Sequence, residues 1–474
     1  MWYGGAVRGV PLLIARVPAD VYVVMNNDMS SYRTPPIETA LFDPRAVISA
    51  EADSPTCTGE DGSALETDQF DSPCVVGRYR IKEEIGRGGM GIVLRAYDEL
   101  LHRDLAIKLL LKSYLDQQEI IDRFVDEALL TSQLQHPCIV PVYDRGFSCD
   151  SRPFFAMKLV SGQSLAAILS NGSGDQQDRL RLLKTLEAVC QTVAYSHSCG
   201  VLHLDIKPSN IMIGEFGEVY LMDWGLAKIW LPDNPSPKQL FNERSVVNTP
   251  LDNHSQPYST GGTPAYMSPE QACGDPVCPK SDVFGLGGTL CEILTGRPPY
   301  RGNNIQGIHS RAIRGRLEDA MCRLDDCKAD GKLVELAKGC LECSLENRIS
   351  SAKEVASSIS QYLETALVQA ESDICRFFDL SLDLFCIATL DGYFDRVNIN
   401  FSRVLGYSSE ALKSRPFLDF IHSEDVEDTL QVMKDLTAGQ QVVHFCNRYR
   451  HADGHYLTLE WTAKRSCPLY GNWC

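Results

Sequence analysis

The stretch His203-Leu-Asp-Ile-Lys-Pro-Ser-Asn210 holds an aspartate, a lysine two residues later and an asparagine five residues later, in a polar loop between apolar runs. Phosphoryl transfer needs a carboxylate that accepts or orients a hydroxyl proton, a cation on the moving phosphate and oxygen ligands for magnesium. Asp223, in Leu221-Met-Asp-Trp-Gly225, follows thirteen residues after Asn210. Asp-Trp-Gly alone is an ordinary turn. Its place after this loop favours a second hard metal ligand.

A glycine-rich stretch lies upstream, in Ile85-Gly-Arg-Gly-Gly-Met-Gly-Ile-Val93. Its G-x-G-x-x-G spacing, at Gly86, Gly88 and Gly91, also occurs in dinucleotide-binding folds, but there it opens a helix. The residues that follow here, Ile92-Val-Leu-Arg-Ala-Tyr97, are typical of a strand instead, and the Gly-Lys-Ser/Thr of a Walker A loop is missing. Two strands joined by such a turn can fold over a triphosphate with backbone N–H groups facing its oxygens.

A lysine follows in an apolar strand pattern, Leu105-Ala-Ile-Lys108, seventeen residues after Gly91. A buried ammonium needs a partner, because burying an unpaired charge costs much free energy. Phosphate oxygens and a carboxylate would both serve. Glu127, on the amphipathic segment Phe124–Leu134, is the best candidate for that carboxylate. A lysine in such a pattern is usually a snorkelling edge residue, but its position after the glycine turn favours a phosphate-binding role.

The spacing of apolar residues changes along the chain. Alternating residues predict strands near 79–85, 92–96 and 104–110, and amphipathic helical patterns dominate after residue 176. This order indicates an α+β body with two lobes. A helical pattern then covers 351–378, and short strands return from residue 383. We therefore expect a helical connector between two folded domains, with a short coiled-coil contact left open.

Residues 79–364 resemble the eukaryotic-like protein kinase family, in its bacterial serine/threonine branch, because the motifs occur in the family's order and spacing. The resemblance implies a bilobal kinase fold, with a β-rich N-lobe and an α-rich C-lobe. It also implies ATP as cofactor, with adenine between Ala106 and Met212 and with Met157 as gatekeeper. The residues assigned to ATP are Ile85, Gly86, Gly88, Gly91, Val93, Ala106, Lys108, Met157 and Met212.

The same resemblance implies the catalytic roles. Asp205 would be the catalytic base, Lys207 would contact the γ-phosphate, and Lys108 would pair with Glu127. Asn210 and Asp223 would bind Mg²⁺, with Mn²⁺ as an alternative. Positions that shape the catalytic loop or the substrate segment are His203, Thr263, Glu270, Asp282 and Arg348, with Glu270 paired to Arg348 and Asp282 bracing the loop. Because scaffolds that lack activity commonly lose one of these groups, the complete set favours an active kinase over a pseudokinase scaffold.

Two residues depart from the family pattern. Leu204 stands where an arginine usually precedes the catalytic aspartate, which puts switching through a phosphate on the activation segment in doubt. Trp224 replaces the usual phenylalanine of the magnesium motif. Neither change removes a catalytic group. Thr263 and Lys207 favour serine or threonine acceptors over tyrosine, and polar residues of 227–262 offer autophosphorylation sites.

Residues 376–474 resemble a PAS sensor domain, an α/β fold. Strands around Asp391-Gly392, a capped helix from Ser423, and strands at 442–450 and 456–464 carry the resemblance. The ligand is unknown: the flavin-adduct cysteine motif is absent, and Cys386 in an apolar strand is expected in the core. The sequence stops where a fifth PAS strand is expected, so that strand is predicted to be missing or supplied in trans. A kinase with such a domain is expected to act in signal transduction.

Charge and targeting complete the prediction. The formal net charge is −17, and residues 37–74 hold nine acids against one base, Arg45. We expect residues 1–75 to be a disordered acidic segment and nucleic acid not to be a partner. The apolar stretch 11–25 is interrupted by Arg16, Pro18 and Asp20, so we expect no membrane span. The expected partners are protein substrates and, through the PAS domain or the connector helix, a second copy of the chain.

Cysteine usage is the remaining compositional feature, with 18 cysteines scattered along the chain. The one cluster with metal-like spacing is Cys322, Cys327, Cys340 and Cys343, which contains a single C-x-x-C pair. Because Cys340 lies in an apolar helical pattern, core cysteines are favoured over a metal site. Reduced thiols and a cytoplasmic location are the expectation.

Overall fold

The structure is a computed structural model that describes residues 11–16, 75–172, 176–230, 263–389, 391–438 and 442–465. The chain divides into a larger unit, Ser63–Ala366, and a smaller unit, formed by Met1–Gly62 and Leu367–Cys474. The smaller unit thus combines residues from both ends of the sequence. Each unit is described by itself below.

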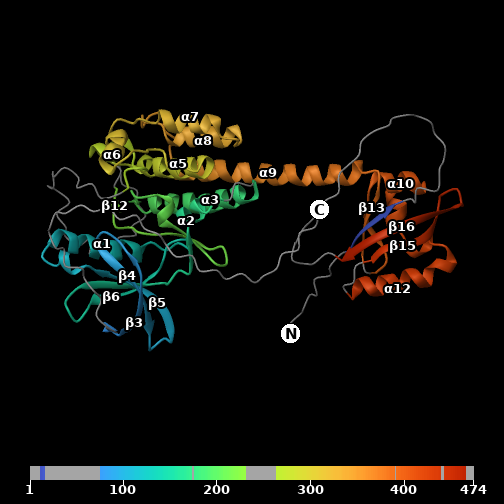
Figure 1. Ribbon diagram of the computed structural model, residues 1–474, viewed down its shortest axis with the longest axis horizontal. Coiled ribbons are helices and arrows are strands. Elements are labelled where there is room, and N and C mark those ends of the chain that lie inside the picture. Colours follow the sequence, from blue (N-terminus) through green and yellow to red (C-terminus); the bar gives the residue numbers. More distant parts are fainter. Residues whose placement is uncertain are drawn as a thin grey trace, which may run out of the picture. The chain divides into compact units, whose positions relative to one another are not determined.

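The larger unit begins with an antiparallel sheet (Figure 1). Its strands are β2 (Val75–Val76), β3 (Tyr79–Arg87), β4 (Gly91–Asp98), β5 (Arg103–Leu110), β6 (Val142–Phe147) and β7 (Pro153–Met157). They lie in the order β2-β3-β4-β5-β7-β6. After the short helix η1 (Lys112–Tyr114), helix α1 (Gln118–Gln133) packs its buried Phe124 and Ala128 against Leu110 and Phe155 of this sheet. The predicted strands near 79–85, 92–96 and 104–110 are confirmed as β3, β4 and β5.

Helices and short strands form the rest of the larger unit. They are β8 (Gly162–Ser164), α2 (Leu165–Ser170), α3 (Gln176–Ser198), β9 (Val201–Leu202), η2 (Pro208–Asn210), β10 (Ile211–Gly214), β11 (Val219–Leu221), β12 (Lys228–Ile229), α4 (Pro269–Cys273), α5 (Pro279–Thr295), α6 (Ile305–Ile313), α7 (Glu318–Asp326) and α8 (Gly331–Cys340). Helix α5 is the centre of this region, because nearly all of its residues are buried. Gly287 lets α5 approach α8 closely, because a Cβ there would clash with the Cβ of Cys340. The predicted sheet-then-helix order of a bilobal α+β body is confirmed.

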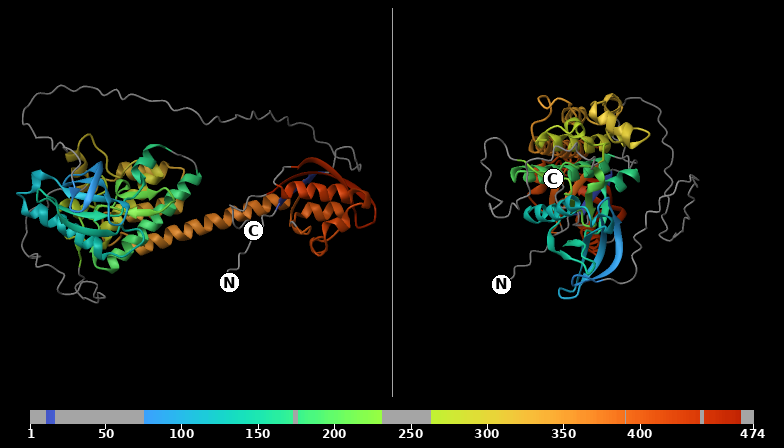
Figure 2. Two further views of the ribbon diagram at one scale, coloured as in Figure 1. Left: turned by 90° about the horizontal axis from the view of Figure 1, so that it is seen from below. Right: turned by 90° about the vertical axis from the view of Figure 1, so that its left-hand side faces the viewer.

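Helix α9 (Ala352–Leu380) is one uninterrupted helix that contributes residues to both units (Figure 2). Its first turns bury Val355 and Ile359 in the core of the larger unit. Its last turns bury Phe378 beside the ring of Phe385 in the smaller unit. The sequence predicts a connector helix over 351–378, and α9 covers this range. Its first turns pack into the core of the larger unit, and its last turns pack on the smaller unit.

The smaller unit is a five-stranded antiparallel sheet with helices packed on it. Its elements are β1 (Pro11–Arg16), β13 (Leu384–Ala388), β14 (Phe394–Val397), α10 (Ile399–Leu405), α11 (Ser409–Lys413), η3 (Phe417–Phe420), η4 (Ser423–Asp425), α12 (Val426–Thr437), β15 (Val442–Arg450) and β16 (Tyr456–Arg465). The strand order is β14-β13-β1-β16-β15. Leu384, Cys386 and Ala388 of β13 alternate into the core with Trp461 and Ala463 of β16.

Strand β1 corrects two predictions. The fifth strand of the sheet, predicted to be missing or supplied in trans, comes from residues 11–16 of the same chain. Composition also predicts a disordered segment over residues 1–75, but residues 11–16 form the central strand of the smaller unit's sheet. Local composition could not reveal this, because the strand's hydrogen-bonding partners lie at the other end of the sequence. The remainder of the acidic segment lies outside the described residues.

Candidate active site

A buried ion pair joins the sheet of the larger unit to α1. The Lys108 ammonium, on β5, donates to both carboxylate oxygens of Glu127, at 2.6 and 2.8 Å, and to Asp223 Oδ1 at 3.2 Å. Burial alone would lower the pKa of Lys108, but the carboxylates of Glu127 and Asp223 outweigh it and raise that pKa. The lysine is therefore a fixed cation, and its predicted pairing with Glu127 is present.

Asp223 is the exposed member of this cluster. Its side chain is 48% exposed, whereas that of Glu127 is 4% exposed. Burial would raise the pKa of Asp223, but Lys108 outweighs burial, with smaller help from His203 and Lys207, and holds that pKa below its ordinary value. An ionised carboxylate thus faces the space beside Lys108, as a hard cation ligand must.

The loop 203–210 gathers a second set of side chains. Asp205 Oδ2 accepts from Lys207 Nζ at 2.7 Å and from Asn210 Nδ2 at 2.9 Å. Lys207 Nζ also donates to Thr263 Oγ1 at 2.8 Å. Because Asn210 uses its amide nitrogen for Asp205, its carbonyl oxygen is the atom that it can offer to a cation. Asn210 and Asp223 together fit the oxygen-ligand chemistry of Mg²⁺.

The two sets of side chains are tied together through the backbone. The N–H of Met222, beside Asp223, donates to the carbonyl of Asn210 at 2.7 Å. His203 Nε2 lies 3.1 Å from the carbonyl of Met222, and its ring packs on Trp224 with centroids 4.5 Å apart. The bulkier indole therefore serves as a packing surface for the loop and leaves the position of Asp223 intact.

Asp282, on the buried helix α5, holds the start of the loop. Its carboxylate accepts from the backbone N–H groups of His203 at 2.8 Å and Leu204 at 2.7 Å. Burial would raise the pKa of Asp282, but His197, with smaller contributions from the ring and the backbone N–H of His203, outweighs it and lowers that pKa. The two backbone bonds fix Leu204 at a positive φ of 63°, an unfavourable conformation for leucine. Asp282 thus sets the direction in which Asp205 leaves the strand.

Sequence reasoning missed three residues that support these groups. His197 Nε2 lies 2.8 Å from Asp282 Oδ2, and Gln271 donates to the carbonyl of Leu204 at 2.6 Å. Ser281 donates to Glu270 Oε1 at 2.7 Å. No spacing rule connects these residues to their partners, since they lie on three different helices, α3, α4 and α5, and only Gln271 contacts the loop itself.

The predicted ATP residues lie mainly on neighbouring strands. The sheet register pairs Gly86 with Val93, Val93 with Lys108, and Ala106 with Met157. Ile85, near the end of β3, is 46% exposed, and Met212 lies in β10. The glycine turn is closed by the N–H of Gly88, which donates to the carbonyl of Gly91 at 2.8 Å. The register thus brings Gly86, Val93, Ala106 and Met157 to the strands around Lys108, whereas Met212 belongs to the sheet β11-β10-β8.

We expect Gly91→Ala to destabilise the sheet, because its Cβ would lie 2.9 Å from the carbonyl oxygen of Leu109. Overpacking of this kind costs about 1–3 kcal/mol. Gly89→Ala is the matched control in the same turn, since no atom lies within 4 Å of its Cβ position. Thermal unfolding of both variants checks this, and equal midpoints would contradict the close approach of β4 to β5.

Glu270 and Arg348 form the other predicted pair. Arg348 donates to Glu270 Oε1 at 2.7 Å and Oε2 at 3.0 Å, and the arginine side chain is 0% exposed. Burial would raise the pKa of Glu270, but Arg348 outweighs it and lowers that pKa. This fork-to-fork pair links α4, which follows the segment at Thr263, to the turn after α8.

The cysteine cluster of the sequence does not form a site. Cys340 is fully buried in the core, whereas Cys322 and Cys343 are exposed. Within the described ranges, the only grouping of His, Cys, Asp and Glu compact enough for a metal is His451, Asp453 and His455, in the turn before β16. The described cysteines are all free thiols.

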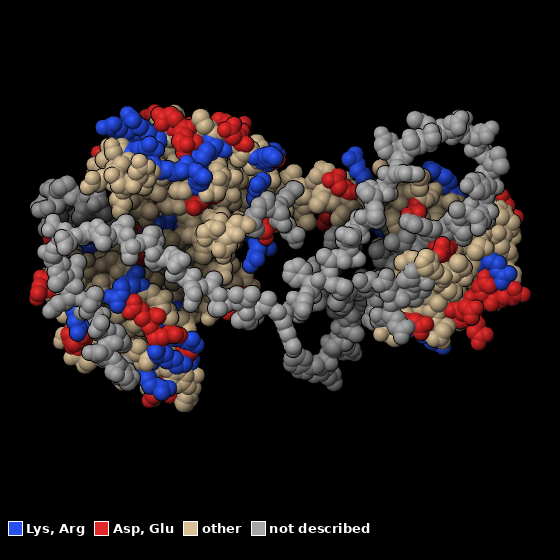
Figure 3. Space-filling model, viewed as in Figure 1, with Lys and Arg blue, Asp and Glu red and all other residues tan. Residues whose placement is uncertain are grey.

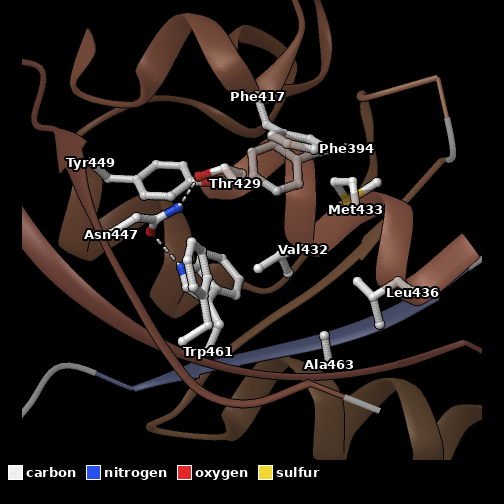
Figure 4. Close-up of a pocket in the computed structure, with 11 residues that line it drawn as sticks. Phe394, Phe417, Thr429, Val432, Met433, Leu436, Asn447, Tyr449, Trp461 and Ala463 are labelled. Carbon is white, nitrogen blue, oxygen red and sulfur yellow. Dashed lines mark hydrogen bonds between the residues drawn. The ribbon is translucent and has the colours of Figure 1, made fainter. Parts of the chain in front are cut away.

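The smaller unit has an apolar cavity, partly open to solvent, between its sheet and α12 (Figure 4). Its polar groups satisfy one another: Trp461 Nε1 donates to Asn447 Oδ1 at 2.7 Å, and Asn447 Nδ2 donates to Thr429 Oγ1 at 3.1 Å. Thr429 in turn donates to the carbonyl of Asp425 at 2.7 Å. The cavity volume is about 30 Å³, room for roughly two waters. Cys386 does not line it, and burial raises the pKa of that thiol.

The surface carries charges of both signs. On the face in Figure 3, Lys and Arg alternate with Asp and Glu over the described residues, without a continuous basic stripe. None of the helices in the described ranges has the length and apolar character needed to span a bilayer.

Comparisons with known proteins agree with this geometry. Residues 79–361 match the protein kinase domain, and residues 394–466 match the PAS fold. Serine/threonine-protein kinase PknD of Protochlamydia amoebophila (strain UWE25) is 35% identical over 296 residues, which cover 60% of this chain and 30% of PknD. Serine/threonine-protein kinase PknB of Mycobacterium tuberculosis (strain ATCC 25618 / H37Rv) is 33% identical over 285 residues, 60% of this chain and 42% of PknB.

The chain therefore spans less than half the length of these two relatives. The kinase match alone covers more than half of the chain, in the region whose geometry is described above. The chain belongs to the protein kinase family, and a PAS fold follows its kinase domain.

Proposed function

We propose that this chain is an ATP-dependent serine/threonine protein kinase in signal transduction, whose output the PAS domain modulates. The observation that carries the proposal is the convergence of two clusters: Lys108 with Glu127 and Asp223, and Asp205 with Lys207 and Asn210. Kinase chemistry is mainly positioning and electrostatic stabilisation, and these clusters supply both.

In this mechanism, Asp205 orients the acceptor hydroxyl and takes its proton. Lys207, held between Asp205 and Thr263, neutralises charge on the transferring phosphate. Lys108 binds the phosphates nearer the nucleoside, and Glu127 fixes its direction. Bound magnesium, held by Asn210 and Asp223, would neutralise phosphate charge. Gly86, Gly88 and Gly91 let backbone N–H groups approach the phosphates.

The test is transfer of label from ATP radiolabelled at its γ-phosphate to the chain itself or to a generic protein substrate, followed by acid hydrolysis. Phosphoserine or phosphothreonine is the expected product, and the label should need a divalent cation. Mn²⁺ is tested beside Mg²⁺. Absence of label, or label on tyrosine alone, would reject the proposal.

The alternative is a pseudokinase joined to a PAS scaffold. It predicts that no γ-phosphate is transferred, whether or not the chain binds ATP. The contacts of Lys108 with Glu127 and Asp223 support an active site, because they keep a cation and a carboxylate side by side where phosphate and a metal would bind. The labelling experiment separates the two hypotheses directly.

Glu127→Gln should lower kcat/KM for ATP-dependent transfer by roughly 10- to 150-fold. The change removes a charged hydrogen-bond partner of Lys108, worth about 1.5–3 kcal/mol. Asp126→Asn, one residue earlier on α1, is the control, since Asp126 makes no hydrogen bond with Lys108 among the contacts of the described residues. Equal losses in both variants would mean that α1 is merely destabilised.

For the PAS domain we propose a sensory role toward a small apolar molecule. The support is the cavity of Figure 4, whose Trp461, Asn447 and Thr429 already satisfy one another and so present no unpaired polar group to a ligand. A cavity of about 30 Å³ excludes a haem or flavin without repacking. A cytoplasmic location stays a prediction.

We also propose a homodimer through α9. Leu367, Ala370, Ile374 and Phe377 are exposed and follow the three-four spacing of a coiled-coil seam. Pairing of two copies would bury this row. Sedimentation of the full chain should give a dimer. Leu367→Lys should weaken it, whereas Ser372→Lys, an exposed position of α9 off the row, should not. A monomeric wild-type chain would reject this contact.

A further inference from the structure

Strand β1 occupies the centre of the smaller unit's sheet, although it belongs to the first residues of the sequence. Residues 12–15 pair antiparallel with residues 387–384 of β13. On its other edge, residues 11–16 pair antiparallel with residues 465–460 of β16. Both backbone edges of the strand are therefore engaged by segments from the C-terminal part of the chain.

The sheet depends on this strand for its continuity. In the order β14-β13-β1-β16-β15, β13 and β16 do not pair with each other, and β1 is the link between them. Without it, two separate hairpins would remain, and an isolated two-stranded hairpin is marginally stable in water. The facing edges of β13 and β16 would also lose backbone partners.

Residues on both sides of the gap between β13 and β16 contribute to the core of the smaller unit. Leu384 and Cys386 of β13 and Trp461 and Ala463 of β16 are buried in one cluster. Trp461 and Ala463 also line the apolar cavity, and the β1 ribbon runs directly beside Ala463 in Figure 4. Separation of the hairpins would therefore open the core and the cavity wall together.

We propose that the gap between β13 and β16 is a strand-acceptor slot, and that residues 11–16 of the same chain are the peptide that fills it. Backbone hydrogen bonds on both edges provide the affinity, as in other cases of β-strand addition. Pro11 stands at the first position of the strand, where proline is tolerated. In the sequence, the kinase domain therefore lies between β1 and β13, which are neighbouring strands of one sheet.

The occupant is the chain's own strand and not that of a second copy. A covalently attached strand acts at an effective concentration on the order of millimolar for a short flexible tether, which falls with tether length. A second copy at micromolar concentration competes poorly with it. The kinase domain is then joined to the PAS domain by two covalent connections, α9 and the segment between β1 and β2.

A disulfide trap in the full chain tests the register. Leu13 lies opposite Cys386, and directly opposed residues of antiparallel strands have Cα atoms about 4.5–5.5 Å apart, within disulfide range. Under oxidised glutathione, the thiol introduced by Leu13→Cys should form a disulfide with Cys386 of the same chain, identified by mass spectrometry of non-reduced peptides. Ile14→Cys is the control, because Phe385 and Thr462 lie opposite it.

The same disulfide formed between two chains would overturn the intramolecular assignment in favour of a second copy. No enrichment of that link over the Ile14→Cys control would overturn the slot itself. If Leu13→Cys does not fold, a second measurement decides.

That measurement is amide hydrogen exchange on full chains carrying Leu13→Pro or Leu13→Ala. Proline removes a backbone donor from a central strand, whereas alanine keeps it. With proline, the amides of β13 and β16 should exchange at least about ten-fold faster than with alanine, and those of α5 should not change. Equal exchange in the two variants would overturn the proposal.

Discussion

Asp205→Asn should lower kcat for phosphoryl transfer by about 100- to 10,000-fold, because a positioned general base contributes a factor of that size. Asparagine retains the shape of the side chain and can still accept from Lys207 or Asn210, which lie 2.7 and 2.9 Å from Asp205 Oδ2. It cannot take the proton of the acceptor hydroxyl. The loss should therefore appear in kcat, with KM for ATP nearly unchanged.

The measurement is initial-rate transfer of the γ-phosphate, with ATP affinity followed separately. Asp326→Asn, an exposed carboxylate at the end of α7, is the control and should keep wild-type kcat. Equal labelling by wild type and Asp205→Asn would exclude the assigned base. A loss of ATP affinity equal to the loss in kcat would instead indicate that the loop 203–210 is deformed.

Much of this site could be predicted from the sequence, because its residues stand in short motifs. Asp205, Lys207 and Asn210 are two or three residues apart, so the geometry of one loop brings them together. Lys108 and Glu127 are nineteen residues apart and still predictable, because a cation in an apolar strand needs a carboxylate partner. The contact of Lys108 with Asp223 was not predicted, because 115 residues separate the two side chains and no local pattern joins them.

The supporting residues could not be predicted, because their partners lie far away in sequence. Gln271 reaches the carbonyl of Leu204 from α4, and His197 reaches Asp282 from α3. Neither carries a local signal, since glutamine and histidine on helices are most often surface residues. Strand β1 is the extreme case: its Leu-Leu-Ile run looks like any short apolar segment until β13 and β16 provide its partners.

Leu204 shows how a departure from a motif can be structurally neutral. Its side chain is 7% exposed, and its backbone is held by Asp282 and Gln271. The loop therefore keeps its direction without the arginine that commonly stands there. Residues 231–262, where a phosphate on the activation segment would lie, are outside the described residues. Whether phosphorylation there changes activity is tested by comparing the chain before and after autophosphorylation.

Arg348→Met should lower the free energy of unfolding of the larger unit by about 3–5 kcal/mol, because it leaves the buried carboxylate of Glu270 without its cation. Arg348 also donates to the carbonyls of Glu342 at 2.7 Å and Lys280 at 2.9 Å, so these acceptors lose their partner as well. Calorimetry of the full chain should show the transition of the larger unit at a temperature lower by about 6–20 °C.

Two further variants test whether the loss of stability in Arg348→Met comes from an unpaired buried charge. Lys338→Met breaks an ion pair with Asp325 in which both side chains are partly exposed, 31% and 62%, so it should cost no more than about 1 kcal/mol. Adding Glu270→Gln to Arg348→Met removes the orphaned charge and should recover part of the loss. If Arg348→Met proves as stable as Lys338→Met, the bidentate pair does not hold α4 in place.

The dependence on pH separates this pair from ordinary packing. The pKa of Glu270 is lower in the folded protein than its ordinary value of 4.5, so the unfolded chain binds its proton at a higher pH than the folded chain does. The stabilisation is therefore complete above about pH 4.5 and is lost as the pH falls through the folded pKa. Arg348→Met lacks this contribution, so the stability difference between wild type and variant should shrink as the pH falls below that range. A difference that stays constant with pH would assign the loss to packing of the arginine side chain alone.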